Sequence, residues 1–410
     1  MATLVKKFGG SSVATPKKMH EIVDRILAEK KDDDKIVIVV SAMGDSTDEL
    51  VSLAKMVNPN MPKREYDRLL ATGEQISIAL LASAFMSKGQ KSLSLTGEQA
   101  GIKTDCSYTK ASILDVDAKR VKASLDEGYI VIVAGFQGGY DGDITTLGRG
   151  GSDTTAVAIA AALKADLCEI YTDVDGVYTA DPRFVKDAIK MDEISFFEML
   201  ELARLGAGVM QPRAVEYGER NGVVIHVRST FNNVPGTLIK EACTMQEKRS
   251  VIRGIAHDTH VAKIAIKGVK DEPGIASKVF SALADANVVV DMIVQSIKSE
   301  DGTNDIVFTV NEEDLVEATS VIERLKGNAI GEFTTDVEIN IAKVSIVGAG
   351  MLGNPGIAAG MFGALAEAGV NISVISTSEI SIMCLVPEDK VELAINTIHN
   401  KFFKNECCEK

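Results

Sequence analysis

Short apolar runs alternate with longer amphipathic segments along the first 240 residues. The apolar runs are rich in β-branched side chains, which is typical of strands buried in a parallel sheet, and they occupy residues 4–8, 35–40, 92–95, 129–135 and 170–177. In the segments between them apolar residues recur every three or four positions, as after Thr15-Pro16, where a capping residue and a proline predict a helix start. The alternation predicts an α/β domain with a mostly parallel sheet over residues 1–240.

An internal repeat follows this domain. Residues 273–296 align without gaps with residues 355–378, and half of the aligned positions are identical. Each copy is expected to form a strand, an amphipathic helix started by a proline, and a second strand. The repeat predicts two small α+β modules, which we place at residues 250–335 and 336–410, after a charged boundary at residues 246–249.

A glycine-rich segment, residues 148–155 (GRGGSDTT), connects the predicted strand at 129–135 to an apolar helical stretch at 156–165. Ser152, Asp153 or Thr154 is expected to cap that helix. Glycines that expose backbone N–H groups beside the positive end of a helix, together with the permanent charge of Arg149, predict an anion site, most simply for phosphate. An ordinary capped turn is the alternative, but it explains neither the arginine nor the acid.

Three further polar residues lie at the ends of predicted elements in this domain. Lys7 ends the first strand and precedes Gly9-Gly10, Ser41 follows the second strand, and Glu74 is a charge within the apolar helical run 69–85. Ligands of open α/β sheets collect at the carboxyl ends of the strands. The lysine precedes the glycines, so the motif is not a Walker A loop. Taken alone, the lysine would be a solvated side chain and the glutamate a capping residue.

Two other motifs do not support the functions that they suggest. The sequence DVDG at residues 173–176 lacks the remaining ligands of a calcium loop. The sequence GAGMLG at residues 348–353 has the spacing of a dinucleotide fingerprint, but too few residues follow it to complete a doubly wound fold. We therefore expect neither a calcium site nor an NAD site.

The composition narrows the choice of partners. The chain has 410 residues and a formal net charge of −14, which argues against nucleic acid or an anionic membrane as the main partner. Its six cysteines show no CxxC spacing and do not indicate a disulfide framework. The N-terminus shows no signal-peptide pattern, and we expect no apolar run to reach the ~18 residues of a membrane helix. We therefore expect a cytoplasmic protein.

In chain order, the motifs resemble those of the aspartokinases over essentially the full length. The matching motifs are residues 7–12 (KFGGSS), 41–44 (SAMG), 72–74 (TGE), 148–155, 172–178 (TDVDGVY) and 181–183 (DPR). The repeat resembles the tandem ACT modules that sense amino acids in these enzymes. The resemblance implies the amino-acid-kinase fold, ATP and Mg²⁺ as cofactors, and phosphorylation of the β-carboxylate of aspartate. This reaction is the first step toward lysine, threonine and methionine, and its end products inhibit it.

The resemblance also implies roles for individual residues. The catalytic residues would be Lys7, Arg149 and Asp153. ATP would be bound by Lys7, Phe8, Gly9, Gly10, Ser41, Thr172, Asp173, Tyr178 and Arg183. Aspartate would be bound by Thr47, Glu74, Arg149, Gly151 and Ser152, with the arginine on a carboxylate and Glu74 on the ammonium. No side chain is assigned as a metal ligand.

The chemistry agrees with this resemblance. A carboxylate acceptor is already ionised at pH 7, so the reaction requires no general base, and no histidine accompanies these motifs. One position departs from the family: Gly208 stands where many relatives carry a lysine near the nucleotide.

The resemblance places an effector, with lysine or threonine as the leading candidates, in the repeat. Its contacts would be Asp271, Pro273, Gly274, Ile275, Ala276, Asn287 and Gln295 in the first copy, and Asn354, Pro355, Asn371, Ile372, Thr377 and Glu379 in the second. The modules would also form a homodimer or a higher homo-oligomer. A second translation start at Met245 would yield a shorter partner chain.

Two alternative functions stay open at this point. The same fold could phosphorylate another acceptor, such as glutamate, N-acetylglutamate or a nucleoside monophosphate. The chain could instead be an amino-acid-binding regulator whose kinase site has decayed, as Gly208 suggests. The set of Thr47, Glu74 and Arg149 favours a free amino acid with two carboxylates, and intact Lys7, Arg149 and Asp153 favour an active kinase.

Overall fold

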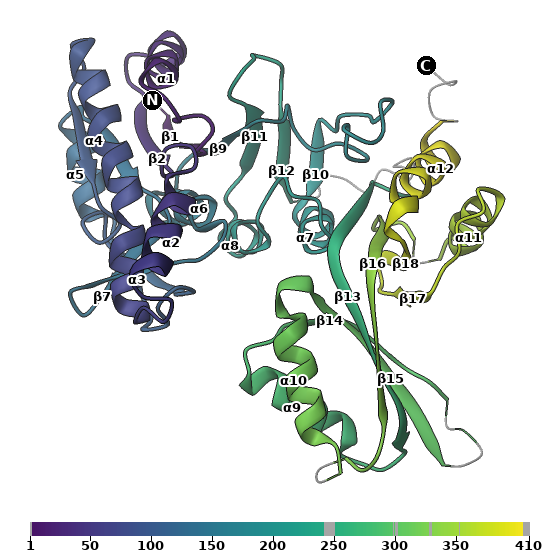
Figure 1. Ribbon diagram of the computed structural model, residues 1–410. Coiled ribbons are helices and arrows are strands. Elements are labelled where there is room, and N and C mark those ends of the chain that lie inside the picture. Colours follow the sequence, from purple (N-terminus) through teal and green to yellow (C-terminus); the bar gives the residue numbers. More distant parts are fainter. Residues whose placement is uncertain are drawn as a thin grey trace. The chain divides into compact units, whose positions relative to one another are not determined.

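A computed structural model describes residues 2–241, 251–297, 299, 302–327, 330–351 and 353–404. They form two compact units. The first unit contains residues 1–178, 190–204 and 208–247, and the second contains residues 179–189, 205–207 and 248–410. In Figure 1 the first unit runs from purple to teal and the second is mostly green to yellow. Met245, Cys407 and Cys408 lie outside the described residues.

The first unit is organised around an eight-stranded sheet of order β10-β12-β11-β9-β1-β2-β6-β3. Every neighbouring pair in it is parallel except β11 and β12. Its strands are β1 (Thr3–Phe8), β2 (Lys35–Val40), β3 (Ser92–Leu95), β6 (Ile130–Ala134), β9 (Leu167–Thr172), β10 (Glu193–Ser195), β11 (Ile225–Ser229) and β12 (Thr237–Lys240). The mostly parallel α/β domain is thus confirmed. The strand expected at 170–177 is displaced, since β9 ends at Thr172, before the DVDG sequence.

A small four-stranded sheet, of order β5-β4-β7-β8, accompanies the large one and was not predicted. Its strands are β4 (Ile102–Thr104), β5 (Ile113–Val116), β7 (Gln137–Tyr140) and β8 (Asp143–Thr146). These strands have three or four residues each, too few for a period-two pattern to be recognised in the sequence.

Helices cover both faces of the large sheet (Figure 1). They are α1 (Pro16–Glu29), α2 (Ser46–Val57), α3 (Lys63–Leu70), α4 (Thr72–Ser87), α5 (Lys119–Asp126), α6 (Gly151–Leu163), α7 (Phe196–Arg204) and α8 (Pro212–Asn221). Helices α1 and α4 share one apolar core with β2 and β6, and α6 packs on β1, β2 and β9. As expected, α1 begins at Pro16, and the Thr15 side chain accepts a hydrogen bond from the backbone N–H of Lys18.

Helix α4 corrects an expectation about membranes. Together, α3 and α4 form a helical run, Lys63–Ser87, that passes a length and composition test for a membrane span, with a mean hydropathy of 1.5 over its best window. The view that no run reaches this length was therefore wrong. However, 56% of that window is buried inside the unit, with Ile78, Leu81 and Phe85 in the core. The run is accounted for as a core helix of a globular unit.

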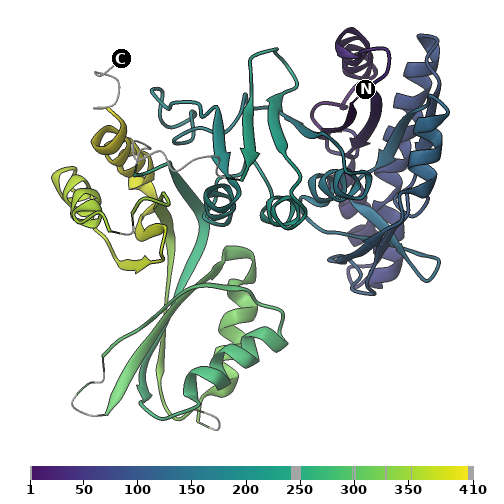
Figure 2. The same ribbon diagram turned by 180° about the vertical axis from the view of Figure 1, so that it is seen from behind.

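The second unit is built on one continuous antiparallel sheet of order β14-β15-β13-β16-β18-β17. Its strands are β13 (Gly254–Lys270), β14 (Val290–Gln295), β15 (Thr303–Asn311), β16 (Thr334–Val347), β17 (Val374–Thr377) and β18 (Ser381–Pro387). Its helices are α9 (Ile275–Asp285), α10 (Leu315–Leu325), α11 (Ile357–Glu367) and α12 (Val391–Phe403), with 3₁₀ turns at Glu312–Asp314 and Glu388–Lys390. Figure 2 shows the long strands β13 and β16 from behind.

The two repeat copies give two apolar cores on this sheet. One core contains α9 and α10, and the other contains α11 and α12 together with Ala180 and Val185 from the segment 179–189. The repeat helices start two residues later than expected, at Ile275 and Ile357. Gly274 and Gly356 are left-handed caps with φ of 95° and 99°, so Pro273 and Pro355 precede the helices in the turn.

A buried ionic cluster lies beneath the large sheet, on the face that carries α1. Lys6 is 3% exposed and its ammonium pairs with Glu169 and, at 3.3 Å, with Glu29. Arg228 donates a hydrogen bond of 2.9 Å to Glu169. Burial disfavours the charges, but the opposite charges outweigh it: the pKa of Lys6 is raised and that of Glu169 is lowered. Both groups are therefore ionised at neutral pH.

We predict that Lys6→Met destabilises the protein by about 3–5 kcal/mol, because it leaves the Glu169 carboxylate buried without its closest cation. Thermal unfolding followed by circular dichroism measures the loss. Lys103→Met is the matched control, since Lys103 is 64% exposed and lies 3.8 Å from Asp115. Equal melting temperatures for the two variants would contradict a stabilising role for the cluster.

Candidate active site

Strand alternation separates two adjacent lysines. Lys6 points to the α1 face and enters the buried cluster, whereas Lys7 points to the opposite face, toward α6. There the Lys7 ammonium lies 2.6 Å from Oδ1 of Asp153. On one face of the strand, Lys6 is therefore a structural cation. On the other face, Lys7 lies at the carboxyl edge of the sheet.

The turn after β1 brings backbone close to this lysine. Gly9 and Gly10 follow the strand, and a Cβ at Gly10 would lie 2.9 Å from the carbonyl oxygen of Ala42. Only glycine therefore allows this approach between the turns after β1 and β2. Ser41, at the end of β2, donates a hydrogen bond of 2.9 Å to the hydroxyl of Ser152 in α6. The predicted residues from three segments thus meet at one edge.

Helix α6 starts five residues earlier than the apolar pattern indicated. Gly150, with φ of 70°, is its left-handed cap, and no side chain makes a capping hydrogen bond. The prediction that Ser152, Asp153 or Thr154 caps the helix is therefore wrong. The left-handed glycine lets the helix begin at Gly151, so Ser152 and Asp153 lie in its first turn and their side chains contact Ser41 and Lys7. Because the helix starts this early, its first turn carries polar side chains into the site.

Glu74 is the buried acid of the site. Its Oε1 accepts a hydrogen bond of 2.9 Å from the backbone N–H of Ala42, whereas its Oε2 has no hydrogen-bond partner among the described residues. Burial raises the pKa of Glu74 to about 7, against the opposing effect of the hydrogen bond from Ala42. Glu74 lines a pocket, and one of its two carboxylate oxygens is available there to bind a cation.

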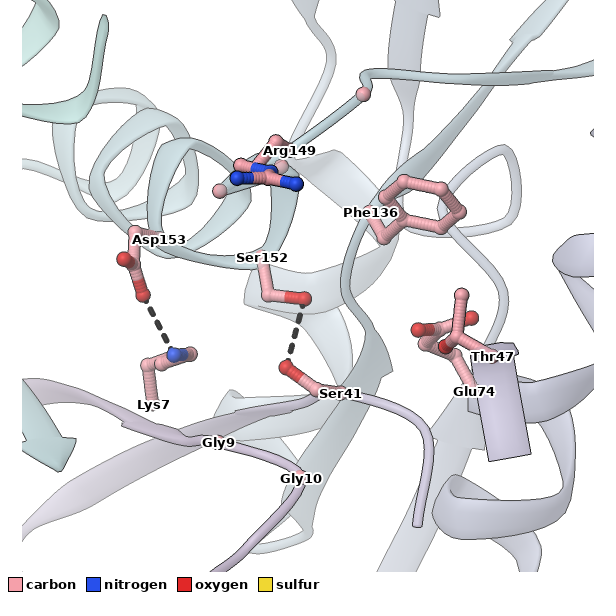
Figure 3. A pocket seen from close by; sticks show the side chains of 13 residues that line it. Lys7, Gly9, Gly10, Ser41, Thr47, Glu74, Phe136, Arg149, Ser152 and Asp153 are labelled. Carbon is pink, nitrogen blue, oxygen red and sulfur yellow. Dashed lines mark hydrogen bonds and ion pairs between the residues drawn. The ribbon is translucent and has the colours of Figure 1, made fainter. Parts of the chain in front are cut away.

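These residues line one pocket of about 280 Å³. The lining comprises Lys7, Gly9, Gly10, Ser41, Thr47, Glu74, Phe136, Gly148, Arg149, Gly150, Gly151, Ser152 and Asp153. Figure 3 shows Lys7 and Asp153 at one end, Thr47 and Glu74 at the other, and Arg149 and the serine pair between them. One end of the pocket, which we call the cationic end, holds Lys7 paired with Asp153. The opposite, acidic end holds Glu74, and the Arg149 guanidinium lies between them.

The residues expected on the nucleotide are divided by this pocket. Lys7, Gly9, Gly10 and Ser41 line it, whereas Phe8, Thr172, Asp173, Tyr178 and Arg183 do not. The ring of Phe8 is buried and stacks on Tyr171 at 4.5 Å, so any contact would come from its backbone. Thr172 is the last residue of β9, the strand that pairs with β1, and its hydroxyl donates a hydrogen bond to Asp173. Tyr178 bridges to Lys190 in the first unit. Arg183 belongs to the second unit, where its guanidinium pairs with Asp181 at 2.6 Å.

The residues expected on an effector lie around the first helix of each repeat copy and on the strand that follows it. Asp271 follows β13 and accepts a hydrogen bond of 3.2 Å from Asn304, and Gln295 ends β14. Asn287 follows α9 with φ of 62°. In the second copy Asn354 precedes α11, and Thr377, which is exposed, ends β17. Ile275 and Ile372 pack into the two apolar cores.

Some lining residues escaped the sequence interpretation. Phe136 lines the pocket and has φ of 66°, an uncommon conformation for an aromatic residue. Its only signal was its place just after the strand at 129–135, at the edge where ligands collect. Gly148, with φ of 77°, was part of the anion motif but was not assigned to a ligand.

The acidic groups do not form a metal site by themselves. Within the described ranges, three or more His, Cys, Asp or Glu side chains nowhere converge as potential ligands. Mg²⁺ is commonly held by one or two carboxylates together with substrate phosphates. Asp153, the acid at the cationic end, fits that mode of binding. The donor set suits a metal that arrives with a nucleotide.

Comparisons with known proteins agree with this geometry. The amino acid kinase family matches residues 2–229, and the ACT domain family matches residues 264–325 and 344–402. The chain is 49% identical over 408 residues to an aspartokinase of Mycolicibacterium smegmatis, a match that covers 98% of this chain and 96% of the relative.

Two solved structures of aspartokinase III from Escherichia coli match the whole chain. One, in complex with aspartate and ADP in the R-state, superposes with a TM-score of 0.82 at 25% identity and covers 98% of this chain and 100% of the other. The other, with lysine and aspartate in the T-state, has a TM-score of 0.76 at 26% identity and covers 98% and 99%. Because both domain types match in order and about half of the residues are shared with a relative along almost all of both chains, the chain belongs to the aspartokinases of the amino acid kinase family.

Proposed function

We propose that the pocket between β1, β2 and α6 transfers the γ-phosphoryl group of ATP to the β-carboxylate of L-aspartate. The observation that carries this assignment is the order of charges along the pocket, from Lys7 through Arg149 to Glu74 (Figure 3). An amino acid with two carboxylates matches this order, because its ammonium requires an anion and its carboxylates require cations. The aspartate- and ADP-bound relative supports the same substrates.

Aspartate would lie at the acidic end and the middle of the pocket. The free Oε2 of Glu74 would accept the ammonium, and Thr47 would add a hydroxyl from the first turn of α2. Arg149 would bind a carboxylate with its planar fork. Gly151 and Ser152 would offer groups from the first turn of α6, where the helix dipole favours an anion.

The phosphates would lie at the cationic end. Lys7 and the backbone of Gly9 and Gly10 would contact the transferring group, and Asp153 would stand between the two substrates. In the structure Asp153 holds Lys7 at 2.6 Å, so the lysine is positioned before any phosphate contacts it. Mg²⁺ bound to the nucleotide would neutralise charge on its phosphates, with Asp153 as the acid best placed to reach it.

The reaction then requires positioning and electrostatics rather than proton removal. The acceptor carboxylate is ionised at neutral pH, and no histidine lines the pocket. Two anions must approach each other, so Lys7 and Arg149 would offset their repulsion. The intact cation set argues against a decayed kinase that only binds amino acids.

Gly208 leaves the nucleotide side with one charge fewer than in many relatives. A Cβ at this position would meet no heavy atom within 4 Å, so the backbone leaves room for a larger side chain. Lys7 would then carry more of the ATP interaction. Thr172, Asp173 and Tyr178 would complete that side.

We further propose that the repeat copies bind an amino-acid effector and form the homo-oligomer. The lysine-bound relative supports lysine as one effector, with threonine as the second candidate. The glycine-capped starts of α9 and α11 would receive the effector carboxylate. A shorter chain that starts at Met245 would contain both modules.

Lys7→Ala tests the kinase assignment. The parent enzyme should form ADP from Mg-ATP with L-aspartate, and much less with L-glutamate or N-acetylglutamate. The variant should lose kcat by a factor on the order of 10²–10³, with a smaller change in KM for aspartate, because the charge acts mainly on the transferring group. A coupled ADP assay measures both constants. Activity of the variant within threefold of the parent would refute the role of Lys7.

The pKa of Glu74 makes a prediction about pH. Only the ionised form binds an ammonium, and its raised pKa means that this form is lost as the pH falls through about 7. The kcat/KM for aspartate should therefore fall about tenfold per pH unit below 7, mainly through KM. Glu74→Gln should raise KM at pH 8 and remove most of this pH dependence.

Glu49→Gln is the matched control, because Glu49 is exposed on α2. It should keep the pH profile of the parent. If Glu74→Gln also keeps that profile, another group controls the binding of aspartate.

Substitutions in the repeat test the effector site. An effector that favours the less active state by ~2–3 kcal/mol lowers activity by one to two orders of magnitude. Asp271→Ala and Thr377→Ala should each weaken inhibition by the cognate amino acid at least tenfold, with uninhibited kcat nearly unchanged. Inhibition curves with lysine, threonine and both together measure this effect. Glu313→Ala is the control, and parental sensitivity of both test variants would place the site elsewhere.

A further inference from the structure

Arg149 depends on its backbone for its position. Its side chain makes no hydrogen bond or ion pair within the parts of the chain that the structure describes, although it lines the pocket. The turn that carries it, residues 147–151, has left-handed glycines on both sides, Gly148 at φ of 77° and Gly150 at φ of 70°. Such a turn is intrinsically adaptable, so contacts from outside it must select one conformation.

One set of contacts comes from the start of α8. The guanidinium of Arg213 donates a hydrogen bond of 2.7 Å to the carbonyl of Leu147 and one of 3.0 Å to the carbonyl of Ala111. It thus holds the residue just before Gly148. Gln211, the cap of α8, covers Gly150 so closely that a Cβ there would lie 1.8 Å from its Cγ.

A second set of contacts reaches the same turn from α3. Asp67 is fully buried, and its carboxylate accepts from the backbone N–H and the hydroxyl of Thr146 at 2.8 and 2.7 Å. It also accepts from the backbone N–H of Thr109 at 2.9 Å. The backbone N–H of Ala111 in turn donates to Thr146. Asp67 therefore fixes the end of β8, which leads into the turn, and Arg213 fixes Leu147, the first residue of the turn.

We propose that Arg213 is a positioning residue for Arg149 and thereby sets the affinity for aspartate. This proposal rests on the proposed function of the pocket. The guanidinium of Arg213 donates hydrogen bonds to two backbone carbonyls. One of them belongs to Leu147, two residues before Arg149. Its contact fixes the direction in which the chain enters Gly148, and that direction decides where the guanidinium of Arg149 lies.

The experiment is a comparison of steady-state kinetics for Arg213→Gln, Arg213→Lys and a control. Arg213→Gln should raise KM for aspartate about tenfold or more, because a displacement of the Arg149 guanidinium by about 1 Å weakens its contact with the substrate by that factor or more. Its kcat and its KM for ATP should stay within threefold of the parent. Arg213→Lys keeps one charged donor and should restore part of the affinity. Arg220→Gln, which lies on the same helix and pairs with Glu216 on the surface, should behave as the parent.

A double variant distinguishes positioning from a structural role. If Arg213 acts through Arg149, adding Arg213→Gln to Arg149→Lys should raise KM for aspartate by less than threefold more. Multiplied effects of the two substitutions, an unchanged KM in Arg213→Gln, or equal losses for both substrates would overturn the proposal. A parent enzyme without aspartate-dependent ADP formation, or an Arg149→Lys variant with parental KM, would instead overturn the function of the pocket.

Discussion

The start of helix α6 is the constraint on which the active site depends. Left-handed glycines at 148 and 150 allow the chain to leave the small sheet and begin a helix at once. As a result Ser152 and Asp153 lie in the first helical turn rather than in a loop before it. Their side chains therefore meet Ser41 and Lys7 from two strands of the large sheet. A residue with a β-carbon at Gly150 would also collide with Gln211.

The second organising feature is the alternation of β1. Consecutive side chains of a strand point to opposite faces, so Lys6 and Lys7 have different environments despite their identical chemistry. Lys6 lies in a buried cluster with Glu29, Glu169 and Arg228, where its charge stabilises the fold. Lys7 pairs with Asp153 at the edge of a pocket. The strand that supplies the positive charge of Lys7 to the site is thus stabilised on its other face by the ion pairs of Lys6.

The pocket also explains how a chain with a net charge of −14 can bind two anionic substrates. Net charge acts over the surface, whereas binding depends on the few groups that converge locally. Here a lysine, an arginine and a helix start supply local positive potential. The buried Glu74 adds a negative group to the same pocket, and burial raises its pKa to about 7.

The sequence by itself determined the sheet, the repeat and most of the pocket. Buried parallel strands and repeated modules leave strong local patterns, and the polar residues that follow strand ends meet at one edge by topology. The sequence could not place the start of α6, the short strands or Phe136. The sign of the φ angle and the close approach of one backbone segment to another leave little trace in residue type. The brace from Asp67 and Arg213 was equally hidden. Its donors and acceptors are mostly backbone groups far apart in the chain, and only tertiary packing brings them together.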